Sequence, residues 1–96
     1  MKVVFTDDAL RDLDEIFEFI SAHYPAIYRA FEKRLRTIAE RIDQWPESAQ
    51  EVQQRPGVRS VPLIRYPYKI FYRVLPDHVE VLHVHHSARD ESEIAE

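Results

Sequence analysis

The chain has 96 residues, of which 45% are apolar and 31% carry a charge, a composition typical of one small globular domain. Its 13 Lys and Arg against 17 Asp and Glu give a net charge of −4, which excludes general polyanion binding by the chain as a whole. The absence of cysteine excludes disulfides, thiolate nucleophiles and cysteine-bound zinc. Gly57 is the only glycine, so glycine-rich phosphate-binding loops are excluded as well.

The same composition bears on location and domain organisation. No apolar run approaches the roughly 18 residues that a bilayer-spanning helix needs, and the start, MKVVFTDDALRD, lacks the apolar stretch of a signal peptide. A chain without cysteine also fits a reducing compartment. We therefore expect a single domain over residues 1–96, located in the cytoplasm and without a membrane segment.

The first half of the chain predicts a strand followed by two helices. Residues 1–5 are mostly β-branched or aromatic, and Thr6 followed by two aspartates is typical of a helix N-cap with an acidic first turn. Apolar residues then recur at steps of three and four over residues 10–20 and again over residues 27–42, with Pro25 between the two runs. We expect an antiparallel hairpin of two amphipathic helices.

The second half predicts a sheet. Residues 47–57 form a polar, aperiodic connection, after which residues 58–63, 68–74 and 79–86 alternate between apolar and polar side chains. A turn is expected at residues 75–78, because proline stands at its second position. The predicted fold is therefore α+β: an N-terminal strand, a helix hairpin and a three-stranded antiparallel meander, with the hairpin covering one face of the sheet.

Basic and aromatic side chains are interleaved in the middle of the predicted sheet, with no acidic residue among them. The basic ones are Arg55, Arg59, Arg65, Lys69 and Arg73. Alternation in the strand at 68–74 places Lys69 and Arg73 on one face, with Phe71 between them. The opposite face, which suits the helices, carries Tyr68, Ile70, Tyr72 and Val74. The basic row is either a strip that binds phosphate groups or an acidic surface, or a solvated face kept soluble by charge.

Four motifs taken together resemble the ParE branch of the RelE/ParE toxin superfamily. They are the arginine opening a strand at Val58-Arg59, the strand YPYKIFYRV, the strand VEVLHV, and the H-x-x-R-D ending of His86, Arg89 and Asp90. The likeness covers nearly the whole chain. It implies the RelE/ParE-like α+β fold and a toxin of a type II toxin–antitoxin module. It also implies a hetero-oligomeric complex with a cognate ParD-like antitoxin, whose C-terminal segment wraps over the toxin.

This resemblance leaves two activities to compare. RelE-like members cut messenger RNA in the ribosome, whereas ParE-like members poison DNA gyrase. Arg65 and Lys69 lie where RelE-like enzymes carry phosphate-contacting residues, but the tyrosine of a RelE-like ending falls on Ala95, which has no proton to transfer. A net charge of −4 also opposes entry into the ribosomal decoding region. We predict gyrase inhibition by protein binding; the alternatives are a ribosome-dependent endonuclease and a degenerate member that only pairs with its antitoxin as a co-repressor.

The predicted target-binding set consists of basic residues, and no catalytic residue is predicted. Its members are Arg59, Arg65, Lys69, Arg73 and Arg89. The first four belong to the basic row, which we expect to be largely exposed or at the rim of the sheet. Arg89 represents the C-terminal segment, where toxicity determinants of the resembled family can also lie. DNA is expected to be contacted only indirectly, through the antitoxin.

Three histidines stand near the end of the last predicted strand. Strict alternation places His83 and His85 on one face, where acidic side chains of the tail offer further ligands for a metal ion. His86 matches the histidine of the ParE-type ending, where its role is structural. We expect the strand histidines to face solvent, and we expect no bound metal and no cofactor.

Overall fold

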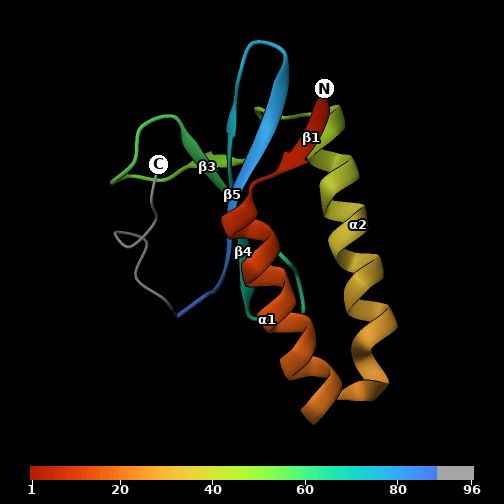
Figure 1. Ribbon diagram of the computed structural model, residues 1–96. Helices are drawn as coiled ribbons and strands as arrows, with labels where there is room; N and C mark the ends of the chain where they lie inside the picture. Colours follow the sequence, from red (N-terminus) through yellow and green to blue (C-terminus); the bar gives the residue numbers. More distant parts are fainter. Residues whose placement is uncertain (89–96) are drawn as a thin grey trace.

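The computed structural model describes residues 1–88 as a five-stranded mixed sheet with two long helices (Figure 1). The elements in chain order are β1 (Lys2–Phe5), α1 (Asp7–His23), the short 3-10 helix η1 (Pro25–Ile27), α2 (Tyr28–Gln44), β2 (Gln50–Glu51), β3 (Val58–Pro62), β4 (Tyr68–Val74) and β5 (His78–His86). Neither long helix is apolar enough over a sufficient length to cross a membrane, and the same holds for η1.

The strands are ordered β1-β5-β4-β3-β2 across the sheet. The predicted meander is present as antiparallel β3, β4 and β5, and the N-terminal strand β1 joins it by pairing in parallel with β5. Beyond the prediction, the polar connection after α2 contributes the two-residue strand β2, which pairs with β3. Alternation could not reveal β2, because two consecutive polar residues show no period.

The helix boundaries follow the expected local signals. The Thr6 hydroxyl accepts a hydrogen bond from the backbone N–H of Ala9 at 3.1 Å, which confirms the predicted N-cap of α1. At the other end, the N–H of Tyr24 donates to the carbonyl of Ile20 at 2.8 Å, and Pro25 begins the turn into α2. One expected member of the apolar stripe, Leu10, is instead exposed on α1.

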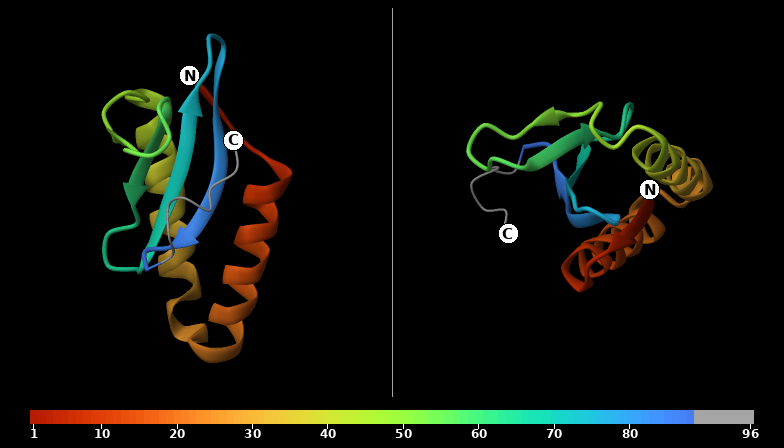
Figure 2. Two further views of the ribbon diagram at one scale, coloured as in Figure 1. Left: turned by 90° about the vertical axis from the view of Figure 1, so that its left-hand side faces the viewer. Right: turned by 90° about the horizontal axis from the view of Figure 1, so that it is seen from above.

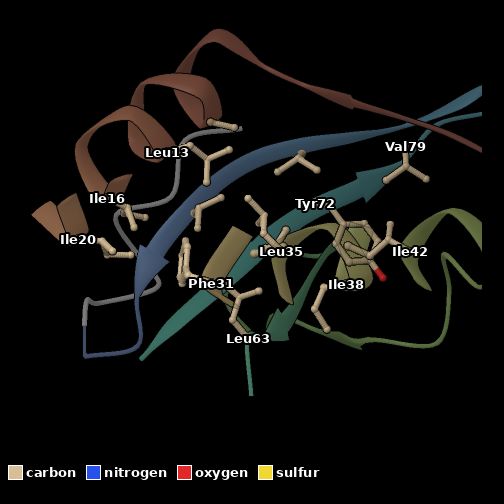
Figure 3. Packing of buried hydrophobic residues seen from close by; sticks show 14 residues of the cluster. Leu13, Ile16, Ile20, Phe31, Leu35, Ile38, Ile42, Leu63, Tyr72 and Val79 are labelled. Carbon is tan, nitrogen blue, oxygen red and sulfur yellow. The ribbon is translucent and has the colours of Figure 1, made fainter. Parts of the chain in front are cut away.

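The main core lies between the helix hairpin and one face of the sheet. Figure 2 shows both helices along the same side of the sheet, and Figure 3 shows their apolar side chains directed toward β4 and β5. Ile70 and Tyr72 are fully buried here, with Tyr68 and Val74 packed at the margin, as the alternation predicted. The helices contribute Ala9, Leu13, Ile16, Ile20, Phe31, Leu35, Ile38 and Ile42.

A second, smaller apolar cluster covers part of the opposite face of the sheet. It consists of Val52, Val58, Phe71 and Leu82. Phe71 therefore does not stand on a solvated face between two basic residues, since it is buried in a cluster with Val52, the residue that follows β2. Its burial links the β2–β3 connection to the centre of the sheet.

A bulge in β5 determines which side chains reach this second face. Tyr72 pairs with Val81 but its neighbour Phe71 pairs with His83, so Leu82 is an extra residue in β5. Beyond the bulge the alternation is inverted: Val84 points into the main core, and His85 is buried on the other face, with 5% of its surface exposed. The expectation that these histidines face solvent is therefore wrong for His85.

Candidate functional site

Lys69 and Arg73 project from β4 on the face opposite the helices, as predicted. Arg73 is paired with Glu80 of the neighbouring strand: its Nε and one terminal nitrogen lie 2.9 Å and 2.8 Å from the same carboxylate oxygen. The two residues are direct cross-strand partners. A partly exposed ion pair of this kind adds little stability, but it offsets the charge that Arg73 presents to a target.

Arg59 does not belong to the same face. On β3 it pairs with Tyr72, and its guanidinium donates to the backbone carbonyls of Ala49 at 2.6 Å and Glu47 at 3.1 Å. Only 22% of its side chain is exposed. Arg59 was expected to be largely exposed or at the rim of the sheet, and it is instead partly buried on the helix side. Strand pairing turns it toward the end of α2, where its hydrogen bonds hold the connection to β2.

Arg65 lies on another part of the surface from Lys69. It occupies the turn between β3 and β4 with a left-handed backbone (φ 85°) and lines a depression on the helix side with Lys33 and Arg34. Lys69 instead lines a depression with Ser60 and the segment around β2. The two side chains thus face different depressions. Arg89, together with Asp90 and Ala95, lies outside the described residues 1–88.

An apolar groove opens at the turn of the helix hairpin, next to Arg65. Three exposed apolar side chains, Phe19, Tyr24 and Ile27, form its outer rim. We call this the hairpin groove; it encloses about 450 Å³ and is also lined by Ile20, Phe31, Arg65, Tyr66, Pro67 and Tyr68. Sequence reasoning missed it, although Phe19 gave a signal as an apolar residue away from the centre of the buried stripe of α1.

Aromatic side chains form the floor of the hairpin groove. The buried ring of Phe31 makes edge contacts with Tyr66 and Tyr68, at centroid distances of 5.2 Å and 5.7 Å. Burial raises the pKa of the Tyr68 hydroxyl above its ordinary value, so this phenol stays neutral at physiological pH. The groove therefore offers a rigid apolar floor with a cationic side chain, Arg65, at its rim.

Comparison with known proteins decides the family. Residues 3–91 match the family described as "ParE toxin of type II toxin-antitoxin system, parDE". The chain belongs to this ParE toxin family. It is therefore a toxin of a type II toxin–antitoxin system, and an antitoxin is its partner. No curated protein sequence matches this ParE toxin significantly.

Solved toxin structures share the fold of this ParE toxin. A chain of the chromosomal ParDE system from P. aeruginosa is 23% identical, with a TM-score of 0.67 over 90% of this chain and 95% of that one. A chain of the RelBE2 toxin–antitoxin complex from Mycobacterium tuberculosis is 25% identical, with a TM-score of 0.60 over 88% and 95%. The isolated E. coli RelE toxin is 18% identical, with a TM-score of 0.61 over 95% and 88%. The predicted RelE/ParE-like fold is thus confirmed.

The ParE toxin also contains a polar cluster between α1 and β5. Oδ2 of Asp12 lies 3.0 Å from Nδ1 of His83 and 3.6 Å from Nε2 of His85, and it accepts the backbone N–H of Val84 at 3.0 Å. Of the three histidines expected to face solvent, His86 is exposed, whereas His83 and His85 are in contact with Asp12 of α1. The acidic tail residues that the sequence offered as partners lie outside the described residues 1–88, and within that range the carboxylate beside both histidines comes from the first helix.

Proposed function

We propose that this ParE-family toxin inhibits DNA gyrase by protein binding, acts in the cytoplasm, and is neutralised by a ParD-like antitoxin through which it contacts DNA only indirectly. The match to the parDE family over residues 3–91 carries the proposal. The sequence motifs point to the same branch, and a negatively charged chain suits a protein target better than a nucleic-acid target.

The placement of the basic residues argues against ribonuclease chemistry. Cleavage of a phosphodiester needs cationic groups and a proton-transfer group that converge on one phosphate. Arg65 and Lys69 face different depressions, and Arg73 is paired with Glu80. Arg65 and Lys69, the two positions where RelE-like enzymes carry phosphate-contacting residues, are therefore not placed to hold the same phosphate.

The hairpin groove is the proposed docking site for the antitoxin. Its exposed rim and aromatic floor suit apolar side chains of an amphipathic segment, which gain free energy by leaving water. The neighbouring depression is lined by Lys33, Arg34 and Arg65, so acidic residues on the same segment would meet complementary charge. We therefore expect the C-terminal segment of the antitoxin to combine apolar anchors with acidic flanks.

The deciding experiment measures gyrase supercoiling and ribosome-dependent messenger RNA cleavage with the same preparation of toxin. We expect loss of supercoiling or accumulation of cleaved plasmid, reversal by the antitoxin, and intact messages in primer extension. Codon-spaced cuts that disappear in Arg65→Ala or Lys69→Ala would instead establish the endonuclease. A protein that binds its antitoxin and represses the operon, yet affects neither assay nor cell growth, would be the co-repressor.

A further inference from the structure

The cluster of Asp12, His83 and His85 has the composition of a metal site. One nitrogen from each histidine and one carboxylate oxygen lie within 4.8 Å of one another. Two imidazoles with one carboxylate are a ligand set that proteins use for zinc and related divalent ions. Within residues 1–88, these are the three potential metal ligands that the fold brings this close together.

The distances from the Asp12 carboxylate to the two histidines are close to those that a metal ion imposes. Ligand bonds of about 2.0–2.1 Å in a tetrahedral site place the ligand atoms roughly 3.3 Å apart. The Asp12 oxygen lies 3.0 Å from His83 Nδ1 and 3.6 Å from His85 Nε2, one distance slightly shorter and the other slightly longer. Shifts of a few tenths of an ångström bring these pairs to the spacing of a coordinated ion.

The carboxylate is already oriented by the backbone. Asp12 accepts the N–H of Val84 at 3.0 Å, and ligating carboxylates in metal sites are commonly held by such hydrogen bonds. The imidazoles are packed face to face at a tilt, with ring centroids 4.6 Å apart, and His85 also contacts the ring of Phe71 at 5.8 Å. Little side-chain freedom remains to be lost when an ion binds.

From this arrangement we propose that Asp12, His83 and His85 bind one divalent transition-metal ion of the zinc class. The ion links α1 to β5, and water completes its coordination, because Asp12 and His83 remain partly exposed at the open side of the cluster. The site lies away from the hairpin groove and shares no residue with it. The proposal is therefore independent of the target and of the antitoxin.

The chain provides a matched control in the same strand. Nδ1 of His78 lies 2.7 Å from Oδ1 of Asp77, so this pair also combines an imidazole and a carboxylate at short distance. It supplies two ligands on an exposed turn, whereas the proposed site supplies three from a packed interface. If ions bound adventitiously to any surface Asp–His pair, His78→Gln would reduce the binding.

The test uses tag-free toxin titrated with Zn²⁺ and, separately, with Co²⁺, whose visible absorption reports coordination. We expect one ion per chain by calorimetry, an intense Co²⁺ spectrum that Zn²⁺ abolishes, and a melting temperature raised by about 5–10 °C at a tenfold excess over Kd. Asp12→Asn and His85→Gln should each weaken affinity at least about 100-fold, because loss of a hydrogen-bond partner of a metal ligand alone costs 10–100-fold. His78→Gln should leave affinity unchanged.

Asp12→Asn keeps an oxygen that can accept the Val84 N–H, so its fold can be verified by circular dichroism without metal even if His85→Gln fails to fold. Several outcomes would overturn the proposal. Wild-type toxin that binds neither ion would reduce the cluster to a hydrogen-bonded contact. Folded Asp12→Asn that binds Co²⁺ as tightly as the wild type, or a loss of binding in His78→Gln, would place the ion elsewhere.

Discussion

The carboxylate of Asp12 accepts a hydrogen bond from the backbone N–H of Val84, which joins helix α1 to strand β5 across 72 residues of chain. The bond lies where β5 loses its other neighbour, because β1 pairs with it only as far as Val81. Just before this point, Thr6 donates from its hydroxyl to the carbonyl of Leu82 at 3.1 Å. Side chains of α1 and of its cap thus cover backbone groups that an edge strand would otherwise expose.

Replacing Asp12 tests whether its hydrogen bond to the edge of β5 stabilises the fold. Asp12→Ala removes the acceptor of a partly buried amide and should lower the free energy of unfolding by about 1–3 kcal/mol. Asp12→Asn retains an acceptor oxygen, so its free energy of unfolding should fall by less than that of Asp12→Ala. Urea denaturation with a chelator present measures both without a contribution from metal. The exposed neighbour Asp14 provides the control: Asp14→Ala should change stability by less than about 0.5 kcal/mol, and an equal loss at both positions would contradict the proposed role.

The local part of this arrangement could be predicted, and the long-range part could not. The cap at Thr6 and the inward side of Ile70 and Tyr72 follow from spacing alone, because helix and strand periods are properties of neighbouring residues. The extra residue Leu82 inverts the alternation in β5 without leaving a turn signal. His83 and His85 share a face as predicted, but the extra residue places them on the face opposite Val79 and Val81, which strict alternation could not show.

The candidate surface was predicted less completely than the fold. Lys69 and Arg73 lie on the expected face, but the pairing of Arg73 with Glu80 depends on the register between β4 and β5. Arg59 lies on the helix side because carbonyl groups after α2 accept hydrogen bonds from its guanidinium there, and this contact depends on how the connection to β2 folds. The hairpin groove needs three separate segments to meet, and no local pattern specifies that meeting.

The hydroxyl of Tyr72 gives a second prediction. It donates to the carbonyl of Pro46 at 2.7 Å, so Tyr72→Phe should cost about 1 kcal/mol at pH 7 while the ring stays in place. Burial raises the pKa of Tyr72, although the Arg59 charge and the Ala49 backbone act in the opposite direction. Equilibrium unfolding in denaturant at pH 7 measures the difference.

The same hydroxyl predicts how this difference depends on pH. A raised pKa in the folded state means that the protonated form is favoured on folding. The contribution of the protonated hydroxyl to the free energy of unfolding is therefore complete below the ordinary tyrosine pKa of about 10. It is lost as pH rises from there toward the pKa of Tyr72 in the folded protein. The difference in the free energy of unfolding between wild type and Tyr72→Phe should therefore become smaller above pH 10. Tyr68 titrates in both proteins and cancels, so a gap that widens would contradict this assignment.

A third prediction compares two apolar residues of α1 that are equally exposed. Phe19 and Leu10 each expose 49% of their surface, but only Phe19 lines the hairpin groove. Phe19→Asp should weaken antitoxin binding at least about tenfold, because it places a charge where apolar anchors dock. Leu10→Asp should bind like the wild type. Calorimetry with the cognate antitoxin measures both, and equal affinities of the two variants would remove the groove from the interface.

The last prediction concerns which residues carry toxicity. If the outer face of β4 engages the target, Lys69→Ala and Arg73→Ala should abolish growth arrest on induction while melting temperature and antitoxin affinity stay near wild type. Arg73 is only partly exposed and its ion pair is solvent-screened, so its removal should cost well under 1 kcal/mol. Glu80→Ala provides the matched change, since it breaks the same pair but leaves the cation: toxicity should persist or increase.

A chain ending at Ala88 tests the C-terminal segment with Arg89. Folded Lys69→Ala and Arg73→Ala proteins that remain fully toxic would exclude the basic face, and loss of toxicity only in the shortened chain would assign it to that segment.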